Sequence, residues 1–208
     1  MPFTVISYYT DNYKPYNDRL TASCERFKLP IVSRRVKNRG SWHQSTAYKP
    51  QFILDMLHEL NTDILYMDAD SEFMAAPKLF NCRMTDIAIH KWSPQTFATG
   101  TIYLSNRPMV HEFVTAWRDI MSEVGIDDPC PDQESFYRAW RLCDQIGIMG
   151  LPPEYCWIDI ASRREYGKRD PVIFHHQASR MHRNHGWAEL DNDGIARLAA
   201  NIDQAGEM

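Results

Sequence analysis

The sequence predicts an α/β fold in which helices flank a mostly parallel central sheet. Short runs of β-branched and aromatic residues alternate with longer segments of helical hydrophobic spacing along most of the chain. The composition agrees, because 44% of the 208 residues are hydrophobic and 24% are charged, as in ordinary folded domains. No repeat, low-complexity tract or linker divides the chain. We therefore expect residues 1–208 to form a single domain, with a C-terminal tail from about residue 184.

The first half of the chain is predicted to contain three strands and two helices. The strands are short apolar runs of β-branched and aromatic residues, and the first helix carries Leu20, Cys24 and Phe27 on one face. Pro50 suits the first turn of the second helix, where its missing N–H is not needed. Polar and turn-forming stretches between these elements are expected to be loops. The predicted strands are 4–9, 31–36 and 64–67, the helices 16–27 and 50–60, and the loops 11–15 and 37–47.

The second half is predicted to add four strands and two main helices. Residues 108–124 form a strongly amphipathic pattern in which large apolar residues recur at three and four positions. Asp132 can cap a following helix that runs to about Cys143. The predicted strands are 86–90, 101–104, 146–151 and 172–175, with a loop at 127–131 and a short helix at 195–202 in the tail.

Two carboxylates follow the apolar strand 64–67 and form the strongest chemical signal. In open α/β sheets ligands bind beyond the carboxyl ends of the strands, which is where Asp68 and Asp70 are expected. Strand alternation puts the two side chains on one side, about 6.5 Å apart. Their mutual repulsion would be relieved by a divalent cation, and oxygen ligands suit magnesium or manganese. The alternative is that one aspartate caps the next element and the other is solvated.

Asp68-Ala69-Asp70 after an apolar strand resembles the Asp-x-Asp motif of GT-A glycosyltransferases, and the order of the surrounding motifs resembles small bacterial and phage members. The resemblance runs from residue 4 to about residue 180. It implies one GT-A catalytic domain with a Rossmann-like sheet, a nucleotide-diphosphate sugar as donor (UDP favoured, GDP second) and a manganese or magnesium ion. The other similar stretches are Gly40-Ser41-Trp42 with Lys49-Pro50, Thr99 to Asn106, Asp132-Gln133 and Val172 to His176.

The resemblance also implies metal ligands. Asp68 would contact the donor ribose and approach the metal, Asp70 would be the main metal ligand, and His175 would be the third. His176 is the competing choice, because strand alternation points the two histidines in opposite directions. A histidine pair at a strand end can also be purely structural.

Further donor-binding residues follow from the same resemblance. Tyr8, Tyr9 and Thr10 end the first strand, where the family lines its base and ribose pocket, and an aromatic ring there can stack on the base. Lys49 and Arg180 could add positive charge at the diphosphate, whose leaving charge the metal would neutralise. The alternatives are ordinary packing for the tyrosines and solvated surface positions for the two cations.

Acceptor binding is the least defined part of the prediction. Asp132 and Glu134 are candidates, and Asp132 could act as the base of an inverting transferase or simply as a helix cap. Trp92, Trp157 and His90 could shape a sugar platform or pack in the core. The acceptor itself (saccharide, lipid-linked or protein) and the oligomeric state are left open.

Two other functions compete with glycosyl transfer. A haloacid-dehalogenase-type phosphohydrolase also uses Asp-x-Asp at a strand end, but its motif follows the first core strand, whereas here two strands precede the strand 64–67 that carries the motif. A non-catalytic nucleotide-sugar-binding protein would have no need of three metal ligands. A nicotinamide enzyme is disfavoured, because no G-x-G-x-x-G turn follows the first strand.

Charge and cysteine content limit the partners and the compartment. The formal net charge is −4, which argues against a nucleic-acid partner. The 5 cysteines include no C-x-x-C pair, which is typical of free thiols in a reducing cytoplasm. No run of about 18 apolar residues occurs, so no transmembrane segment is expected.

Overall fold

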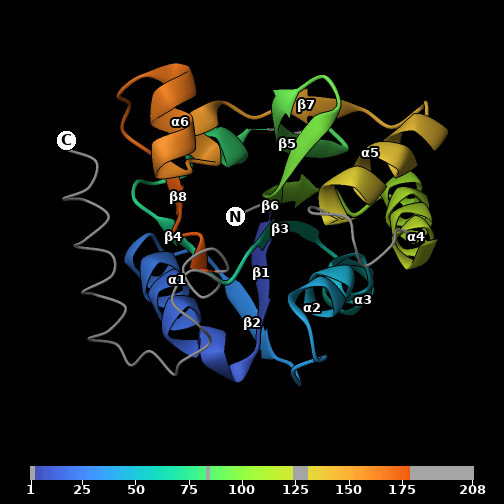
Figure 1. The fold of residues 1–208 in the computed structure, drawn as a ribbon, viewed down its shortest axis with the longest axis horizontal. Helices are drawn as coiled ribbons and strands as arrows, with labels where there is room; N and C mark the ends of the chain where they lie inside the picture. Colours follow the sequence, from blue (N-terminus) through green and yellow to red (C-terminus); the bar gives the residue numbers. More distant parts are fainter. Residues whose placement is uncertain (1–2, 83–84, 124–130, 179–208) are drawn as a thin grey trace.

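The computed structural model describes residues 3–82, 85–123 and 131–178, and these form an α/β sandwich around a six-stranded sheet (Figure 1). The strand order is β2-β1-β3-β6-β5-β7. All strands run parallel except β6, which is antiparallel to both of its neighbours. The predicted mostly parallel sheet is thereby confirmed. The strands are β1 (Phe3–Tyr9), β2 (Ile31–Arg35), β3 (Asp63–Met67), β5 (Ile87–Ser93), β6 (Thr96–Leu104) and β7 (Ile148–Gly150).

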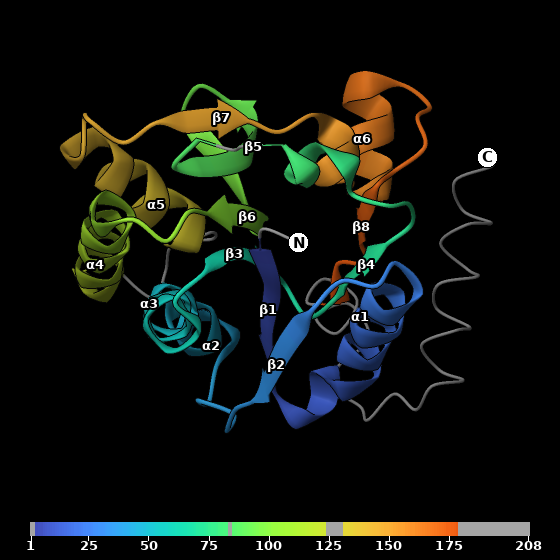
Figure 2. The same cartoon turned by 180° about the vertical axis from the view of Figure 1, so that it is seen from behind.

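Helices cover both faces of the sheet, as Figures 1 and 2 show from opposite sides. One face packs against α3, α4 and α5 through a core that includes Phe52, Trp117 and Phe136. The other face packs against α1 through Leu20 and Cys24. The helices are α1 (Lys14–Arg26), α2 (Trp42–Ala47), α3 (Lys49–Leu60), α4 (Pro108–Glu123), α5 (Pro131–Leu142) and α6 (Asp159–Tyr166).

A second, two-stranded sheet lies on the α1 side of the main sheet. It pairs β4 (Ser71–Phe73) antiparallel with β8 (Ile173–His175), with Ser71 opposite His175. The apolar residues Phe73 and Ile173 are fully buried and anchor this small sheet to the core. The chain therefore brings residues about a hundred positions apart in sequence into direct register.

Two segments that were predicted to be loops are partly helical. Residues 11–15 contain the 3-10 turn Asp11–Tyr13 and the start of α1. Residues 37–47 contain α2, which is held by a capping box between Ser41 and Gln44. Helix α6 and strand β4 were not predicted at all. The predicted tail helix at 195–202 and most of the loop at 127–131 lie outside the described residues.

No helix in the described part of the chain is long and apolar enough to cross a membrane.

Candidate metal and donor site

A tight turn follows β3 and carries the two aspartates. The Asp68 N–H donates to the Gly100 carbonyl at 2.9 Å, which extends the pairing of β3 with β6 by one residue. The Ser71 N–H then donates to the Asp68 carbonyl at 3.0 Å, which closes the turn. Asp70 therefore lies in a turn, and the strand alternation from which the sequence argument placed it beside Asp68 does not apply.

The turn nevertheless brings three potential metal ligands together. One ligand atom from each of Asp68, Asp70 and His175 lies within 4.8 Å of the others. Asp70 and His175 are almost fully buried, whereas 35% of the Asp68 side chain is exposed. Manganese and magnesium prefer the oxygen ligands that the two carboxylates supply, and they tolerate the nitrogen ligand of the imidazole. The residues present thus fit the divalent cation that the sequence predicts.

Gly100 lets the backbone of β6 lie against two of these side chains. A Cβ at this position would lie 2.8 Å from His175 Cε1, 3.0 Å from His175 Nδ1 and 3.0 Å from Asp68 Oδ2. Real Cβ contacts are seldom this short, so a larger residue would push His175 or Asp68 out of place. The close approach of these two side chains to β6 therefore depends on a glycine at this position.

The His175 ring is neutral. Burial lowers the pKa of the ring to about 4, so at neutral pH one of its nitrogens carries no proton. Its Nε2 lies 2.9 Å from Thr101 Oγ1 and its Nδ1 lies 3.1 Å from Ser71 Oγ. A metal would take the place of one of these hydroxyl partners, and the other would keep the ring oriented.

His176 is oriented differently. Its backbone N–H donates to the Asp70 carbonyl at 2.9 Å, and its Nε2 lies 3.1 Å from Glu72 Oε2. The side chain is thus paired with a carboxylate outside the three-residue cluster. Of the two histidines, His175 is the one whose ring contributes to the ligand cluster.

The carboxylates of Asp70 and Asp68 repel each other. Burial and the negative charge of Asp68 together raise the pKa of Asp70 to about 6. The Ala178 N–H donates to Asp70 Oδ2 at 2.8 Å and partly offsets this effect. Like charges that are held together in this way favour a cation between them.

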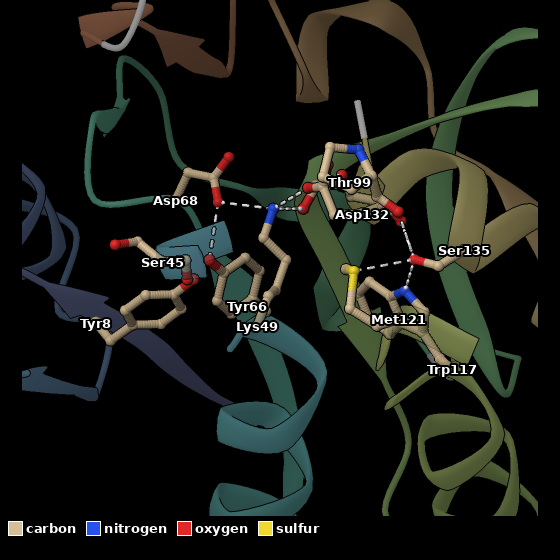
Figure 3. Close-up of polar contacts among 11 residues, drawn as sticks. Tyr8, Ser45, Lys49, Tyr66, Asp68, Thr99, Trp117, Met121, Asp132 and Ser135 are labelled. Atoms are coloured by element: carbon tan, nitrogen blue, oxygen red, sulfur yellow. Dashed lines mark hydrogen bonds and ion pairs between the residues drawn. The ribbon is translucent and has the colours of Figure 1, made fainter. Parts of the chain in front are cut away.

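Lys49 begins α3 and contacts both Asp68, which follows β3, and Asp132, which is in α5 (Figure 3). Its Nζ lies 3.1 Å from Asp68 Oδ1 and 2.6 Å from Asp132 Oδ2, and it donates to the Thr99 carbonyl at 3.2 Å. Burial alone would lower the pKa of Lys49. The negative charges of Asp132 and Asp68 have the larger combined effect and raise this pKa, so the ammonium stays protonated. With 3% exposure, Lys49 is no solvated surface cation.

Asp132 is the second residue of α5, so it does not serve as the N-cap. Its Oδ2 accepts hydrogen bonds at 2.6 Å from both Lys49 Nζ and Thr99 Oγ1. Burial alone would raise the pKa of Asp132, but Lys49 and Thr99 hold it below its usual value. A carboxylate with a lowered pKa and two strong donors is a poor base.

The end of β1 lies beside α2 and α3. The Tyr8 hydroxyl donates to the Ser45 carbonyl in α2 at 2.9 Å, and the Tyr8 ring packs against Phe52 and Tyr66. Tyr9 is half-buried, and Thr10 is buried with its hydroxyl bonded to Asn12. The structure thus places all three residues at the same sheet edge as Asp68, and Tyr8 is oriented by a helix that the sequence had not indicated.

The remaining predicted residues lie outside the cluster of Asp68, Asp70 and His175. Glu134 is exposed on α5, and Arg180 lies outside the described residues. Trp157 is 1% exposed and its carbonyl accepts the His175 N–H at 2.8 Å, so it supports β8 from behind and cannot be a sugar platform. His90 is also buried, whereas Trp92 is half-exposed.

Four residues were missed by the sequence reasoning. Tyr66 donates its hydroxyl to Asp68 Oδ1 at 2.8 Å, Ser71 and Thr101 flank the His175 ring, and Gly100 lets that ring lie against β6. The stretch from Thr99 to Asn106 had been recognised as similar to a family strand. Its two threonine hydroxyls and its glycine were the available signal.

The chain has the fold of known glycosyltransferases. It matches a glycosyltransferase involved in the glycosylation of the major capsid of PBCV-1 with a TM-score of 0.66 and 14% identity, over 88% of this chain and 98% of that one. The apo form of GlyE from Streptococcus pneumoniae TIGR4 matches with 0.59 and 11%, over 98% and 64%. The bifunctional glycosyltransferase WbbM matches with 0.56 and 12%, over 84% and 45%. The chain thus spans less than two thirds of GlyE and of WbbM.

No protein-family model and no curated protein matches the sequence. At 11–14% identity the structural matches establish the fold, which is the GT-A-like fold that the sequence predicted.

Proposed function

We propose that this chain is a metal-dependent glycosyltransferase that moves a sugar from a nucleotide-diphosphate sugar to an acceptor hydroxyl. The observation that carries the proposal is the convergence of Asp68, Asp70 and His175 beside Gly100, at the edge of a GT-A-like sheet. Function depends on the site and not on the fold alone. Here the fold and the chemistry of the ligand set both support metal-dependent glycosyl transfer.

Asp68, Asp70 and His175 are the residues that would hold the cation, with manganese favoured and magnesium second. When bound, the cation supplies positive charge that stabilises the diphosphate as it leaves the sugar. UDP is the favoured nucleotide and GDP the second choice, on the resemblance stated above. One of the two hydroxyl partners, Ser71 or Thr101, would keep the His175 ring in place for this role, while the nitrogen beside the other would bind the cation.

Lys49 acts as a positioning residue in this proposal. An ammonium has three protons, and Lys49 Nζ already has three oxygen partners in Asp68, Asp132 and Thr99. A direct contact with donor phosphate would require it to give up one of them. Its contribution is to fix the Asp68 carboxylate and to hold α5 against the end of β6.

The donor nucleotide is proposed to lie toward β1. Tyr8, Tyr9 and Thr10 end that strand next to β3, where an aromatic ring is available to stack on a base. Asp132 would serve as a base for the acceptor only if it released Lys49 and Thr99, so we assign it a positioning role in the acceptor half of the site.

A phosphohydrolase is less well supported. In that chemistry the first aspartate is the nucleophile, and with Asp68 Oδ1 paired with the Tyr66 hydroxyl and Lys49, only Oδ2 would be available for attack. The antiparallel strand β6 beside β3 and the glycosyltransferase matches also favour transfer. A non-catalytic sugar-nucleotide binder would have the same site, so activity has to separate it from a transferase.

Calorimetry tests the donor site directly. UDP and GDP are titrated with and without manganese into the wild type, into Asp70→Ala and into a control, Asp55→Ala, which removes an exposed carboxylate on α3. We expect one diphosphate to bind only with manganese, in the wild type and the control but not in Asp70→Ala. Binding that ignores both the metal and Asp70, or no binding at all, would overturn the proposal.

Donor hydrolysis then separates enzyme from binder. A transferase that holds its donor in a reactive state releases sugar slowly to water, so incubation of the bound UDP- or GDP-sugar with manganese should yield free UDP or GDP. Binding without any release would support the non-catalytic alternative.

A further inference from the structure

A cluster of three rings lies across the sheet from the donor side. His90 and Trp92 belong to the end of β5, and Tyr166 ends α6. The Trp92 and Tyr166 rings are stacked with centroids 6.0 Å apart and an interplanar angle of 27°. His90 meets Trp92 edge-on at 4.9 Å and Tyr166 at 5.7 Å. We call these three residues the aromatic cluster.

Hydrogen bonds hold the cluster in one arrangement. His90 Nδ1 lies 2.9 Å from the Leu151 carbonyl, which can only accept, so Nδ1 carries the proton. Burial lowers the pKa of His90, so the ring is neutral and its Nε2 accepts. The Tyr166 hydroxyl, 3.2 Å away, is the donor to that nitrogen. The His90 and Tyr166 rings are therefore fixed before any ligand arrives, which reduces the entropic cost of binding.

Exposure distinguishes this cluster from the core. Trp117 and Trp157 are fully buried, but Trp92 and Tyr166 both remain partly exposed above the buried His90. Trp92 and Tyr166 thus form a small, partly exposed aromatic surface that packs on the buried His90 ring. Packing alone does not require two large rings to stack where solvent reaches them.

The cluster lies on the same face of the sheet as His175. Ile89 pairs with Ile102 and Lys91 with Phe97, so His90 lies across from residues 98–101, which include Gly100. His90 follows Ala88 by two residues, and Ala88 and Tyr103 both face the α1 side of the sheet. Thr101, which holds His175, shares that face with Tyr103.

The strand order separates the aromatic cluster from the proposed base site. In the order β2-β1-β3-β6-β5-β7, the donor residues of β1 lie on one side of β3. The aromatic cluster, on β5, lies on the other side, with only β6 between β5 and β3. A ligand on this cluster is therefore positioned opposite the nucleotide, with Asp68 and Asp70 between them.

We infer that the aromatic cluster is a binding subsite for a pyranose ring, which makes the acceptor a saccharide; this inference rests on the proposed function. The C–H groups on one face of a pyranose are slightly positive and pack against the negative face of an aromatic ring. Its hydroxyls need polar neighbours, and Arg169, whose guanidinium carbon lies 6.0 Å from the Tyr166 ring centroid, can supply donors.

A lipid chain fits this surface less well. Among the residues that the structure describes, three of the four exposed large aliphatic side chains are on other elements. The fourth, Ile160, is on α6 six residues before Tyr166, which puts it about 120° around the helix from that ring. The other three are Met74, Met109 and Leu142.

The test is direct binding of simple sugars to the intact chain. The protein is labelled with 5-fluorotryptophan, and the Trp92 resonance is assigned by its loss in Trp92→Phe. Methyl pyranosides of glucose, galactose, mannose, N-acetylglucosamine, xylose, rhamnose and fucose are titrated to millimolar concentrations. We expect at least one to shift the Trp92 resonance saturably, while the resonances of the buried Trp117 and Trp157 stay in place.

Variants establish which rings matter. Tyr166→Ala should raise the dissociation constant of that pyranoside by about tenfold, and Tyr166→Phe, which keeps the ring, should raise it less. Trp140→Phe is the matched control, because Trp140 is half-buried on the opposite face of the sheet and should leave binding unchanged. Circular dichroism of each variant confirms that it is folded.

Failure has a clear form. If no pyranoside shifts Trp92, or if vesicles of phosphatidylcholine and phosphatidylglycerol shift it instead, the saccharide subsite is wrong. Calorimetry with UDP, GDP and manganese on the wild type is independent of these rings. Donor binding without sugar binding therefore overturns only this inference, and absence of donor binding overturns the proposed function.

Discussion

Gly100 shows how a missing side chain lets two potential metal ligands lie close to a strand. The alanine Cβ would lie within 3.0 Å of His175 and Asp68, so Gly100→Ala should displace them and abolish manganese-dependent diphosphate binding. Gly150→Ala is the control, because Gly150 is also in a strand and no atom lies within 4 Å of its Cβ position. Calorimetry on both variants checks this, and normal metal-dependent binding by Gly100→Ala would show that the site does not need this close approach.

The two adjacent histidines give a second prediction at this scale. His175→Ala removes the imidazole from the ligand cluster, and we expect manganese affinity to fall by at least about tenfold, as for loss of a metal ligand or its support. His176→Ala removes a ring that pairs with Glu72 and should leave the affinity within a few-fold. Electron paramagnetic resonance of free manganese measures both. Equal losses would mean that both rings serve the metal.

Lys49 should be essential for stability. Lys49→Met leaves the Asp132 carboxylate buried without its cation, a change that typically costs about 3–5 kcal/mol. Adding Asp132→Asn removes that charge, so the double variant should be more stable than Lys49→Met alone. The exposed pair of Arg34 and Glu59 provides the control, since Arg34→Met should change stability by less than about 1 kcal/mol. Urea unfolding gives all four values, and a mild effect of Lys49→Met would contradict the positioning role.

At the scale of elements, α2 depends on its capping box. The Ser41 hydroxyl accepts the Gln44 N–H at 3.1 Å, and the Gln44 side chain accepts the Ser41 N–H at 3.0 Å. A six-residue helix is marginal without such a cap. Ser41→Ala should therefore cost about 1 kcal/mol, and Ser41→Asp should restore most of it. Because α2 provides the carbonyl that orients Tyr8, weaker UDP binding by Ser41→Ala is expected as well.

Elements with a strong hydrophobic period were predictable and short polar ones were not. Helix α4 has apolar spacing that only a helix explains, whereas the apolar run of β3 is too short for a helix, and both were predicted within a few residues. Helix α6 has few buried residues and a polar sequence, so its pattern gives little signal. Its position follows from tertiary contacts, including the bond between Tyr166 and His90.

The site also contains features that were predictable from the sequence and features that were not. Asp68, Asp70 and His175 could be named from the sequence because charged and imidazole groups at strand ends are unusual and chemically specific. The turn that brings Asp70 to them could not, because it requires β4 to pair with β8 from the far end of the chain. Lys49 was named, but its burial was not foreseen, since its partner Asp132 lies 83 positions away.

For the whole molecule, the site links parts of the chain that are distant in sequence. Asp68 and Asp70 follow β3, His175 ends β8, and Gly100 belongs to β6. Asp68 and Asp70 stay close to each other once the chain unfolds, but His175 and Gly100 do not stay close to them, so the unfolded state cannot form the complete ligand set. A cation and a diphosphate that bind here therefore stabilise the folded state only.

This linkage gives the last prediction. At about a hundredfold excess of ligand over its dissociation constant, binding adds about 2.7 kcal/mol. For a chain of this size that raises Tm by roughly 5–11 °C. Scanning calorimetry should show this shift with manganese and UDP or GDP together, and a smaller one with either alone. Asp70→Ala should lose the shift and Asp55→Ala should keep it. An equal shift in both variants would place the stabilising ligand elsewhere, because only Asp70 belongs to the ligand cluster.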